Sequence, residues 1–227
     1  MYDHIYEMTL CGVDNMCKTI LFQGDSITDC GRNRSEFYSL GDGYPLLVAS
    51  QLAVSYPQAY HFVNRGISGN RIVDVYARIK AEIINLKPDY LSLLIGINDV
   101  WHEINDKNGI SAPKFETLYD LLLQEIIEQL PQIKIMIMEP FVLEGSATYD
   151  SQEPSRWEYF RAETALRAEI AKKMAAKYNL EFIPLQQLFD AATNEAPADY
   201  WLKDGVHPSI AGHQIIKDAW LAHFQNL

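Results

Sequence analysis

A serine in a strand-to-helix turn and a distant Asp-Gly-Val-His loop are the residues of this sequence best suited to chemistry. Ser26 follows Gly24 and Asp25 after a short apolar run, and its hydroxyl is a weak nucleophile unless a base accepts its proton. Among the histidines, only His207 has a carboxylate, Asp204, three residues before it in a loop that precedes a helix. Asp204 at that spacing can accept from the imidazole Nδ1–H, which leaves the Nε2 lone pair for Ser26. The pattern predicts a serine nucleophile with a histidine base and an orienting aspartate.

Acyl transfer also requires donors for the negative charge that develops on the attacked carbonyl oxygen. Gly69 would offer its backbone N–H and Asn98 a neutral side-chain amide, and the backbone N–H of Ser26 is a third donor. Asp25 and Asp99 are expected to support loop backbone near the site. A second carboxylate beside the nucleophile would oppose formation of the oxyanion, so neither is given a catalytic step.

These residues follow short apolar runs that alternate with longer segments of helical period, which is the pattern of an α/β protein with helices on both faces of a parallel sheet. Ligands bind beyond the carboxyl ends of the strands in such a sheet, so the loops carrying Ser26, Gly69 and Asn98 should share one edge. The sequence predicts about five strands, near Thr19–Phe22, His61–Val63, Tyr90–Ile95, Ile133–Met138 and Leu180–Ile183.

Capping residues and apolar periodicity place several helices between and after these strands. We expect helices capped by Asp42 and running to Ser55, opened by Pro113, spanning Pro154 to Lys177, and capped by Ser209. Two polar stretches, Asn105–Ala112 and Glu144–Ser155, are expected to be surface loops near the mouth of a site. The chain, 1–227, is expected to form one domain, with residues 1–17 as an N-terminal extension.

Charge and composition narrow the class of partner. The chain has 227 residues, 48% of them hydrophobic, and 19 basic against 30 acidic residues give a net charge of -11. That charge would repel phosphate backbones and anionic lipid surfaces, so we expect no nucleic-acid or membrane partner and favour small neutral substrates such as sugars. A homo-oligomer is compatible with the sequence.

The sequence offers no pattern for a bound metal or an export signal. The cysteines include no CxxC pair and the histidines no HExxH motif, so no metal is expected. The segment from Met1 to Lys18 lacks a basic start and an unbroken apolar stretch, and no run approaches membrane-spanning length. We therefore expect a cytoplasmic protein.

Four segments together resemble the motif blocks of the SGNH (GDSL) hydrolase family in order and spacing: Gly24-Asp25-Ser26, Gly69, Gly96-Ile97-Asn98-Asp99 and Asp204-Gly205-Val206-His207. The resemblance implies a flavodoxin-like three-layer α/β/α fold and ester hydrolysis through an acyl-enzyme, without metal or cofactor. It also implies that Ser26 is the nucleophile, that Gly69 and Asn98 complete the oxyanion hole, and that His207 and Asp204 are base and orienter.

Longer stretches around these blocks resemble bacterial acetylxylan esterases of the same family: Gly24-Asp25-Ser26-Ile27-Thr28-Asp29-Cys30-Gly31-Arg32, Gly66-Ile67-Ser68-Gly69-Asn70, Gly96-Ile97-Asn98-Asp99-Val100-Trp101 and Val206-His207-Pro208-Ser209-Ile210-Ala211-Gly212-His213. That branch implies removal of acetyl groups from xylan-derived sugars. The chain departs from it at Lys203, where an aromatic residue is expected before the acid. Trp101, Tyr200 and Trp201 are candidates for stacking on a sugar, with core or lid packing as the alternative.

Other interpretations remain open at this point. Each motif alone is better explained as a turn or a helix cap, and only their combination favours catalysis. A lipid or thioester acylhydrolase would use the same three residues with a longer acyl pocket. A protein of another class, a catalytically silent carbohydrate-binding protein, would keep the fold and bind sugar without hydrolysing esters.

Overall fold

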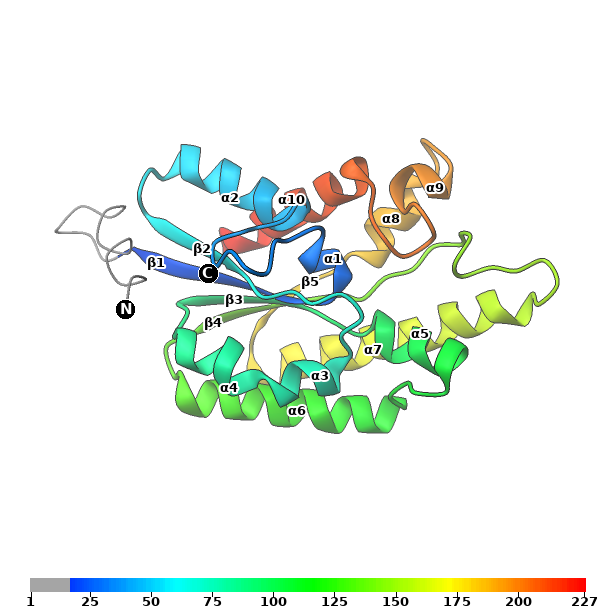
Figure 1. Cartoon of the computed structure of the whole chain (residues 1–227), viewed down its shortest axis with the longest axis horizontal. Helices are drawn as coiled ribbons and strands as arrows, with labels where there is room; N and C mark the ends of the chain where they lie inside the picture. The colour runs from blue at the N-terminus through cyan, green and yellow to red at the C-terminus, as the bar shows by residue number, and fades with distance from the viewer. Residues whose placement is uncertain (1–16) are drawn as a thin grey trace.

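A computed structural model of the chain describes residues 17–227, and residues 1–16, which make up nearly all of the expected N-terminal extension, lie outside this range. The described part contains a five-stranded parallel sheet in the order β2-β1-β3-β4-β5 (Figure 1). All five predicted strands are present, with ends within two residues of the prediction: β1 (Lys18–Gly24), β2 (Tyr60–Asn64), β3 (Tyr90–Leu94), β4 (Lys134–Met138) and β5 (Glu181–Ile183).

The strands read as apolar runs because helices cover the sheet on both sides. Successive side chains of a strand point to opposite faces, so Ile20 and Phe22 of β1 join one apolar cluster and Leu21 joins the other. The first cluster packs under α2 (Tyr44–Ser55) and α10 (Ile210–Phe224). The second packs against α3 (Ile72–Ala77), α4 (Ile79–Glu82), α6 (Ala112–Gln129) and α7 (Ser155–Tyr178) on the opposite face (Figure 1). The expected three-layer α/β/α architecture is confirmed.

The remaining elements are mostly short and lie in the connections. The helices other than α2 and α10 are α1 (Ser26–Asp29), α3 (Ile72–Ala77), α4 (Ile79–Glu82), the 3-10 turn η1 (Ile84–Leu86), α5 (Ile97–Asp106), α6 (Ala112–Gln129), α7 (Ser155–Tyr178), α8 (Gln186–Ala192) and α9 (Ala198–Trp201).

One predicted helix cap is wrong and another is confirmed. The residue that caps α2 is Gly43 rather than Asp42. A side chain at Gly43 would come within 2.9 Å of Cys30 Cβ and His213 Cε1, so close packing leaves room only for glycine there. At α10, the hydroxyl of Ser209 accepts a hydrogen bond from the backbone N–H of Gly212, as a capping serine should.

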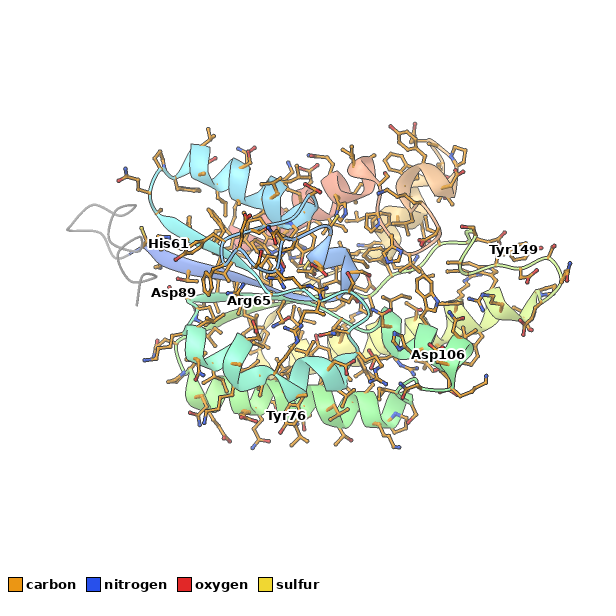
Figure 2. The ribbon with its side chains drawn as sticks, viewed as in Figure 1. His61, Arg65, Tyr76, Asp89, Asp106 and Tyr149 are labelled. Atoms are coloured by element: carbon orange, nitrogen blue, oxygen red, sulfur yellow. The ribbon has the colours of Figure 1, made fainter. Side chains whose placement is uncertain are left out.

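The order of the strands puts a switch point beside β1. The chain leaves β1 toward β2 on one side and returns to place β3 on the other, so the loops after β1 and β3 diverge at the carboxyl edge of the sheet. The two predicted surface loops lie on this side, where Asp106 ends α5 and Tyr149 lies on the long connection before α7 (Figure 2). Within residues 17–227, no helix is long and apolar enough to cross a bilayer.

Candidate active site

Ser26 is the first residue of α1, and Asp25 alone separates it from the carboxyl end of β1. The Asp25 side chain caps this short helix by accepting from the backbone N–H of Ile27 at 3.0 Å. Ser26 is partly exposed, and its Oγ lies 2.9 Å from His207 Nε2, although the two residues are 181 positions apart in the sequence. The fold thus brings the predicted nucleophile and the predicted base into hydrogen-bond contact.

Asp204 makes three hydrogen bonds, two to His207 and one to Val206. Its Oδ2 lies 2.7 Å from His207 Nδ1, and its Oδ1 accepts from the backbone N–H groups of Val206 and His207 at 2.9 and 2.8 Å. An ionised carboxylate can only accept, so the proton between the two side chains belongs to Nδ1 and the neutral ring presents its Nε2 lone pair to Ser26.

The hydrogen bonds of this pair shift both pKa values. Partial burial would raise the pKa of Asp204, but the hydrogen bonds from the side chain and backbone of His207 and from Val206 bring it down to about 2. The hydrogen bond to Asp204 raises the pKa of His207 above its usual 6.5, against the opposing effect of burial. Asp204 is therefore ionised across the whole range in which His207 titrates.

Asn98 and the Gly69 loop are joined to each other. The Nδ2 group of Asn98, near the start of α5, donates to the backbone carbonyl of Asn70 at 3.2 Å. Asp99 accepts from the backbone N–H of Ile72 at 3.2 Å with each of its oxygens, just beyond the same loop. Gly69 has a φ of +83°, in the left-handed region that favours glycine. The two predicted oxyanion donors thus lie on neighbouring, connected segments.

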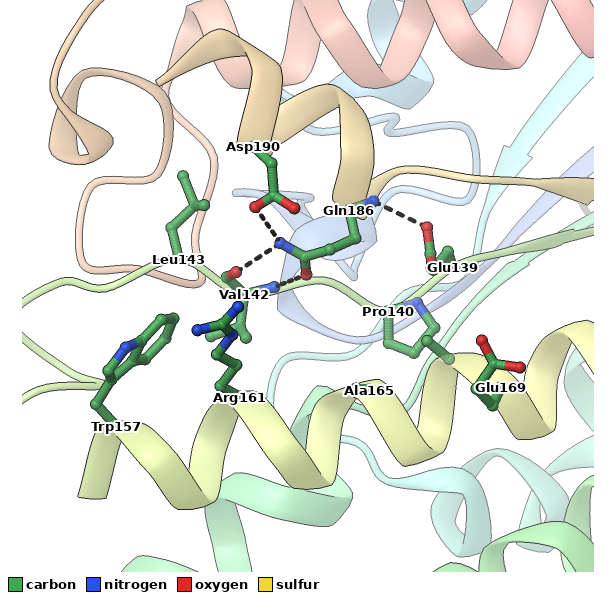
Figure 3. Close-up of a pocket in the computed structure, with 11 residues that line it drawn as sticks. Glu139, Pro140, Val142, Leu143, Trp157, Arg161, Ala165, Glu169, Gln186 and Asp190 are labelled. Carbon is green, nitrogen blue, oxygen red and sulfur yellow. Dashed lines mark hydrogen bonds between the residues drawn. The ribbon is translucent and has the colours of Figure 1, made fainter. Parts of the chain in front are cut away.

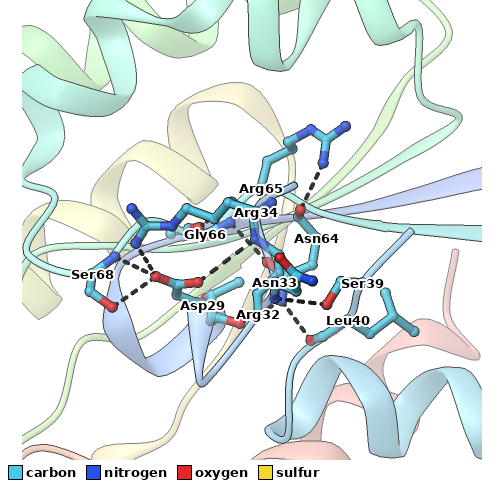
Figure 4. A network of polar contacts seen from close by, with 12 residues as sticks. Asp29, Arg32, Asn33, Arg34, Ser39, Leu40, Asn64, Arg65, Gly66 and Ser68 are labelled. Carbon is cyan, nitrogen blue, oxygen red and sulfur yellow. Dashed lines mark hydrogen bonds and ion pairs between the residues drawn. The ribbon is translucent and has the colours of Figure 1, made fainter. Parts of the chain in front are cut away.

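A second set of polar contacts ties the Gly69 loop to α1 (Figure 4). Asp29 Oδ2 accepts from both the backbone N–H and the hydroxyl of Ser68, at 2.9 and 2.8 Å, and it also pairs with Arg34. Arg32 donates to the carbonyl of Gly66 at 2.9 Å. Sequence reasoning gave none of these residues a role, although Asp29, Arg32 and Ser68 lie inside the stretches that carry the family resemblance.

Arg78 holds the far side of the same loop. Its guanidinium donates to the carbonyl of Arg65, the side chain of Asn70 and the side chain of Gln23, at 2.8, 2.9 and 2.7 Å. Burial lowers its pKa to about 10, which still leaves it charged at neutral pH. Arg78 lies 52 positions from Ser26, and nothing in the sequence sets it apart from the other charged residues of its segment, Asp74, Lys80 and Glu82.

Both predicted supporting carboxyls are buried beside the site. Asp99 and Asp25 are 0% and 1% exposed, and Asp25 Oδ2 has no hydrogen-bond partner among residues 17–227. Burial raises the pKa of Asp99 well above its usual range and that of Asp25 to about 7. Asp25 accepts from the backbone of Ile27 in α1 and Asp99 from that of Ile72 at the start of α3, so both side chains contact the first residues of helices rather than the loop backbone expected from the sequence.

The raised pKa of Asp25 predicts a pH-dependent cost to stability. Between about pH 4 and pH 7 the folded state keeps a proton that the unfolded state has lost, so the free energy of unfolding falls as pH rises through this window. Asp25→Asn removes the titration while keeping an oxygen for the Ile27 N–H. Urea unfolding is measured for both proteins at pH 5 and at pH 8. Between these pH values the free energy of unfolding of the wild type should fall by about 2–3 kcal/mol more than that of the variant. Equal decreases in the two proteins would show that Asp25 titrates normally.

Of the three aromatic candidates for sugar stacking, Trp101 lies against the Ser26–His207 pair. Its ring centroid is 5.6 Å from that of His207 and 5.9 Å from that of Phe160. Tyr200, 57% exposed, contacts the ring of Trp201 instead, and the Trp201 indole donates to the carbonyl of Ala196. Trp101 therefore serves at least partly as packing for the histidine ring.

Cys30 contacts a histidine that sequence reasoning did not pair with it. Cys30 Sγ lies 3.2 Å from His213 Nε2, while His213 Nδ1 accepts from the backbone N–H of Tyr44. The proton of the neutral ring is therefore on Nε2 and points at the sulfur, so His213 is not placed to deprotonate Cys30. Burial lowers the pKa of His213 to about 4 and raises that of Cys30.

No cluster of three or more His, Cys, Asp or Glu side chains within residues 17–227 is arranged to hold a metal ion. The Ser26 hydroxyl, the His207 imidazole and the Asp204 carboxylate form one hydrogen-bonded series, which is the arrangement that acyl transfer through a serine requires.

Known proteins are similar to this chain in sequence and in fold along nearly its whole length. The model of the GDSL-like lipase/acylhydrolase family matches residues 22–215. An acetylxylan esterase from Geobacillus stearothermophilus is 36% identical over 209 residues, which cover 89% of this chain and 91% of the relative.

Solved structures agree with these sequence matches. A crystal structure from Parabacteroides merdae, described as a GDSL-like lipase, matches with a TM-score of 0.85 and 36% identity, over 93% of this chain and 98% of that one. A crystal structure of an acetylxylan esterase from Geobacillus stearothermophilus matches with a TM-score of 0.80 and 34% identity, over 92% and 94% of the two chains. The chain belongs to the GDSL-like lipase/acylhydrolase family and is a carboxylic ester hydrolase.

Proposed function

We propose that the protein is a serine esterase that removes O-acetyl groups from carbohydrate, with acetylated xylo-oligosaccharides as its substrates. The observation that carries the proposal is the hydrogen-bonded series Ser26–His207–Asp204 at the carboxyl edge of the sheet. The similarity to acetylxylan esterases supports the choice of substrate. The net charge of -11 also favours a neutral ligand over an anionic one.

In the first step Ser26 Oγ attacks the carbonyl carbon of the ester while His207 Nε2 takes its proton. The negative charge on the carbonyl oxygen is stabilised by the backbone N–H groups of Ser26 and Gly69 and by the Asn98 side chain. His207 then gives the proton to the ester oxygen of the sugar as the bond between this oxygen and the acyl carbon breaks, and the sugar leaves with a free hydroxyl. Ser26 is left as an acetyl ester.

In the second step water attacks the acetyl group on Ser26 and His207 again takes the proton. The same donors stabilise the new tetrahedral intermediate, and the proton returns to Ser26 Oγ as acetate leaves. Asp204 stays ionised throughout, since its pKa of about 2 lies far below that of His207, and it stabilises the imidazolium formed in each half.

Variants of the relative support the assignment of these three residues. Matched structures of the Geobacillus stearothermophilus esterase include catalytic mutants in which a serine, an aspartate or a histidine is replaced by alanine. In that protein the aspartate and histidine are three positions apart, as Asp204 and His207 are. Another mutant replaces a tryptophan directly before the aspartate, and this chain has Lys203 directly before Asp204, so the two proteins differ at that position.

Removal of the Asn98 amide should slow the reaction without unfolding the protein. Asn98→Ala deletes one oxyanion donor, and we expect kcat for 4-nitrophenyl acetate to fall on the order of 10²-fold or more with a small change in KM. Asn108→Ala, at an exposed asparagine on a nearby loop, is the matched control and should keep wild-type kinetics. An Asn98→Ala enzyme with full activity would remove that residue from the mechanism.

Preference for acyl chain length tests the substrate proposal. We expect kcat/KM for 4-nitrophenyl acetate to exceed that for the octanoate ester by at least about tenfold, and acetylated xylo-oligosaccharides to release acetate. The reverse preference would identify a lipid or thioester acylhydrolase that uses the same residues. Binding of xylo-oligosaccharide without hydrolysis of any ester would instead indicate a silent carbohydrate-binding protein.

A further inference from the structure

A pocket of about 320 Å³ lies between α7, α8 and the segment that follows β4 (Figure 3). Its volume is at the lower end of the roughly 300–1,000 Å³ found for small-molecule sites. Ser26, His207 and Asp204 are not among its lining residues. The pocket is therefore distinct from the acyl-transfer site.

One wall of the pocket is fixed by hydrogen bonds. Glu139 Oε2 accepts from the backbone N–H groups of Leu185 and Gln186, at 2.6 and 2.8 Å. The side chain of Gln186 accepts from the N–H of Val142, donates to its carbonyl, and donates to Asp190 Oδ1, all within 3.0 Å (Figure 3). Glu139, Gln186 and Asp190 are thus held in place before any ligand arrives.

Several polar groups of the pocket remain available to a ligand. Arg161 extends from α7 into the pocket, and within residues 17–227 it makes no ion pair or hydrogen bond (Figure 3). The second oxygens of Glu139 and Asp190, and the carboxylate of Glu169, are likewise not used by the contacts that fix the wall. Trp157 closes one end with its indole ring, next to Arg161.

The mixture of these groups suits a ligand that both donates and accepts hydrogen bonds. Three carboxylates, Glu139, Glu169 and Asp190, would repel an anion, and the single guanidinium of Arg161 reduces their attraction for a cation without reversing it. Hydroxyl groups can donate to the carboxylates and accept from Arg161, while the C–H face of a pyranose ring can pack on Trp157. A sugar ring meets all of these requirements in one molecule.

We propose that this pocket is an accessory carbohydrate site that binds an unacetylated neutral sugar ring, such as a xylosyl unit. The identity of the sugar rests on the proposed function, whereas the class of ligand follows from the pocket itself. Leu143 lines the pocket, and its backbone N–H donates to the carbonyl of Gly205, between Asp204 and His207, at 2.9 Å. One backbone segment therefore separates the two sites, and the accessory site would hold sugar close to the catalytic loop.

The proposal is tested by isothermal titration of the Ser26→Ala protein with xylotriose, which carries no ester. In this background we compare Arg161→Ala, which removes the cationic partner, with Ala165→Trp, which fills the pocket and keeps every charge. Lys172→Ala, an exposed cationic residue of the same helix outside the pocket, is the matched control. Each pocket variant should weaken binding at least about tenfold, and the control should leave it unchanged.

Unchanged affinity in both pocket variants would overturn the proposal, because the sugar would then bind elsewhere. The absence of binding by any unacetylated xylo-oligosaccharide would overturn it as well, as would stronger binding of glucuronate or spermidine. Hydrolysis of 4-nitrophenyl acetate, measured on the same pocket variants with Ser26 intact, should stay within about twofold of wild type. Failure of the esterase proposal would appear in that assay for the wild type, independently of the titrations.

Discussion

Ser26→Ala is expected to lower kcat for ester hydrolysis by at least about 10⁴-fold, to the level that binding and the oxyanion donors supply alone. The loss follows from the proposed chemistry, because no other hydroxyl replaces the Oγ that lies 2.9 Å from His207 Nε2. The fold should be unaffected, since α1 is held by the backbone of Ser26 and by the Asp25 cap. Steady-state kinetics with 4-nitrophenyl acetate, together with circular dichroism, measure both parts of this expectation.

Ser151→Ala is the matched control, because it removes a hydroxyl from an exposed turn in the loop before α7. Its kcat and KM should equal those of the wild type. A Ser26→Ala protein that kept a tenth or more of wild-type turnover would place the nucleophile elsewhere.

Asp204→Asn should have the second-largest effect, on the order of 10³–10⁴-fold in kcat. An asparagine amide can donate to His207 Nδ1, which stabilises the ring with its proton on Nε2, where it faces Ser26. The base is then in the wrong tautomer although the geometry is kept. Asp199→Asn, at an exposed aspartate on α9, is the control and should leave kcat unchanged.

The same variant should move the pH profile in a defined direction. His207 acts as a base only when neutral, so kcat/KM falls as pH drops through its pKa, which is raised above 6.5 in the wild type mainly by the hydrogen bond to Asp204. Without the carboxylate the pKa of His207 decreases. The acid limb of the kcat/KM profile of Asp204→Asn should therefore shift to lower pH, and an unshifted limb would mean that Asp204 does not control this titration.

The sheet and its position relative to the site were predictable because local patterns determine them. Five apolar runs gave five strands, since a parallel sheet covered on both faces needs continuous apolar sequence. The rule that ligands bind at the carboxyl edge then placed Ser26, Gly69 and Asn98 on adjacent loops. The short helices α3, α4, α8 and α9 were not predicted, because four to seven residues give too little periodicity to detect.

Contacts between distant segments account for most of what the sequence did not show. Asp42 satisfied the local rule for a cap of α2, but Gly43 occupies that position because Cys30 and His213 pack against it. The hydrogen bonds of Arg78 to the loop after β2 and to Gln23 of β1 have no local signature. The raised pKa of Asp25 likewise depends on burial, which follows from packing rather than from residue type.

The acyl-enzyme is the intermediate on which the account depends, and trapping it is the most direct test. The wild-type protein would be mixed with 4-nitrophenyl acetate, quenched with acid before the first turnover is complete, digested and analysed by peptide mass spectrometry. We predict one acetyl group on the peptide that contains Ser26, located on Ser26 by fragmentation and absent from the Ser26→Ala protein. Turnover with no acetylated Ser26, or with the acetyl group on another residue, would contradict the mechanism.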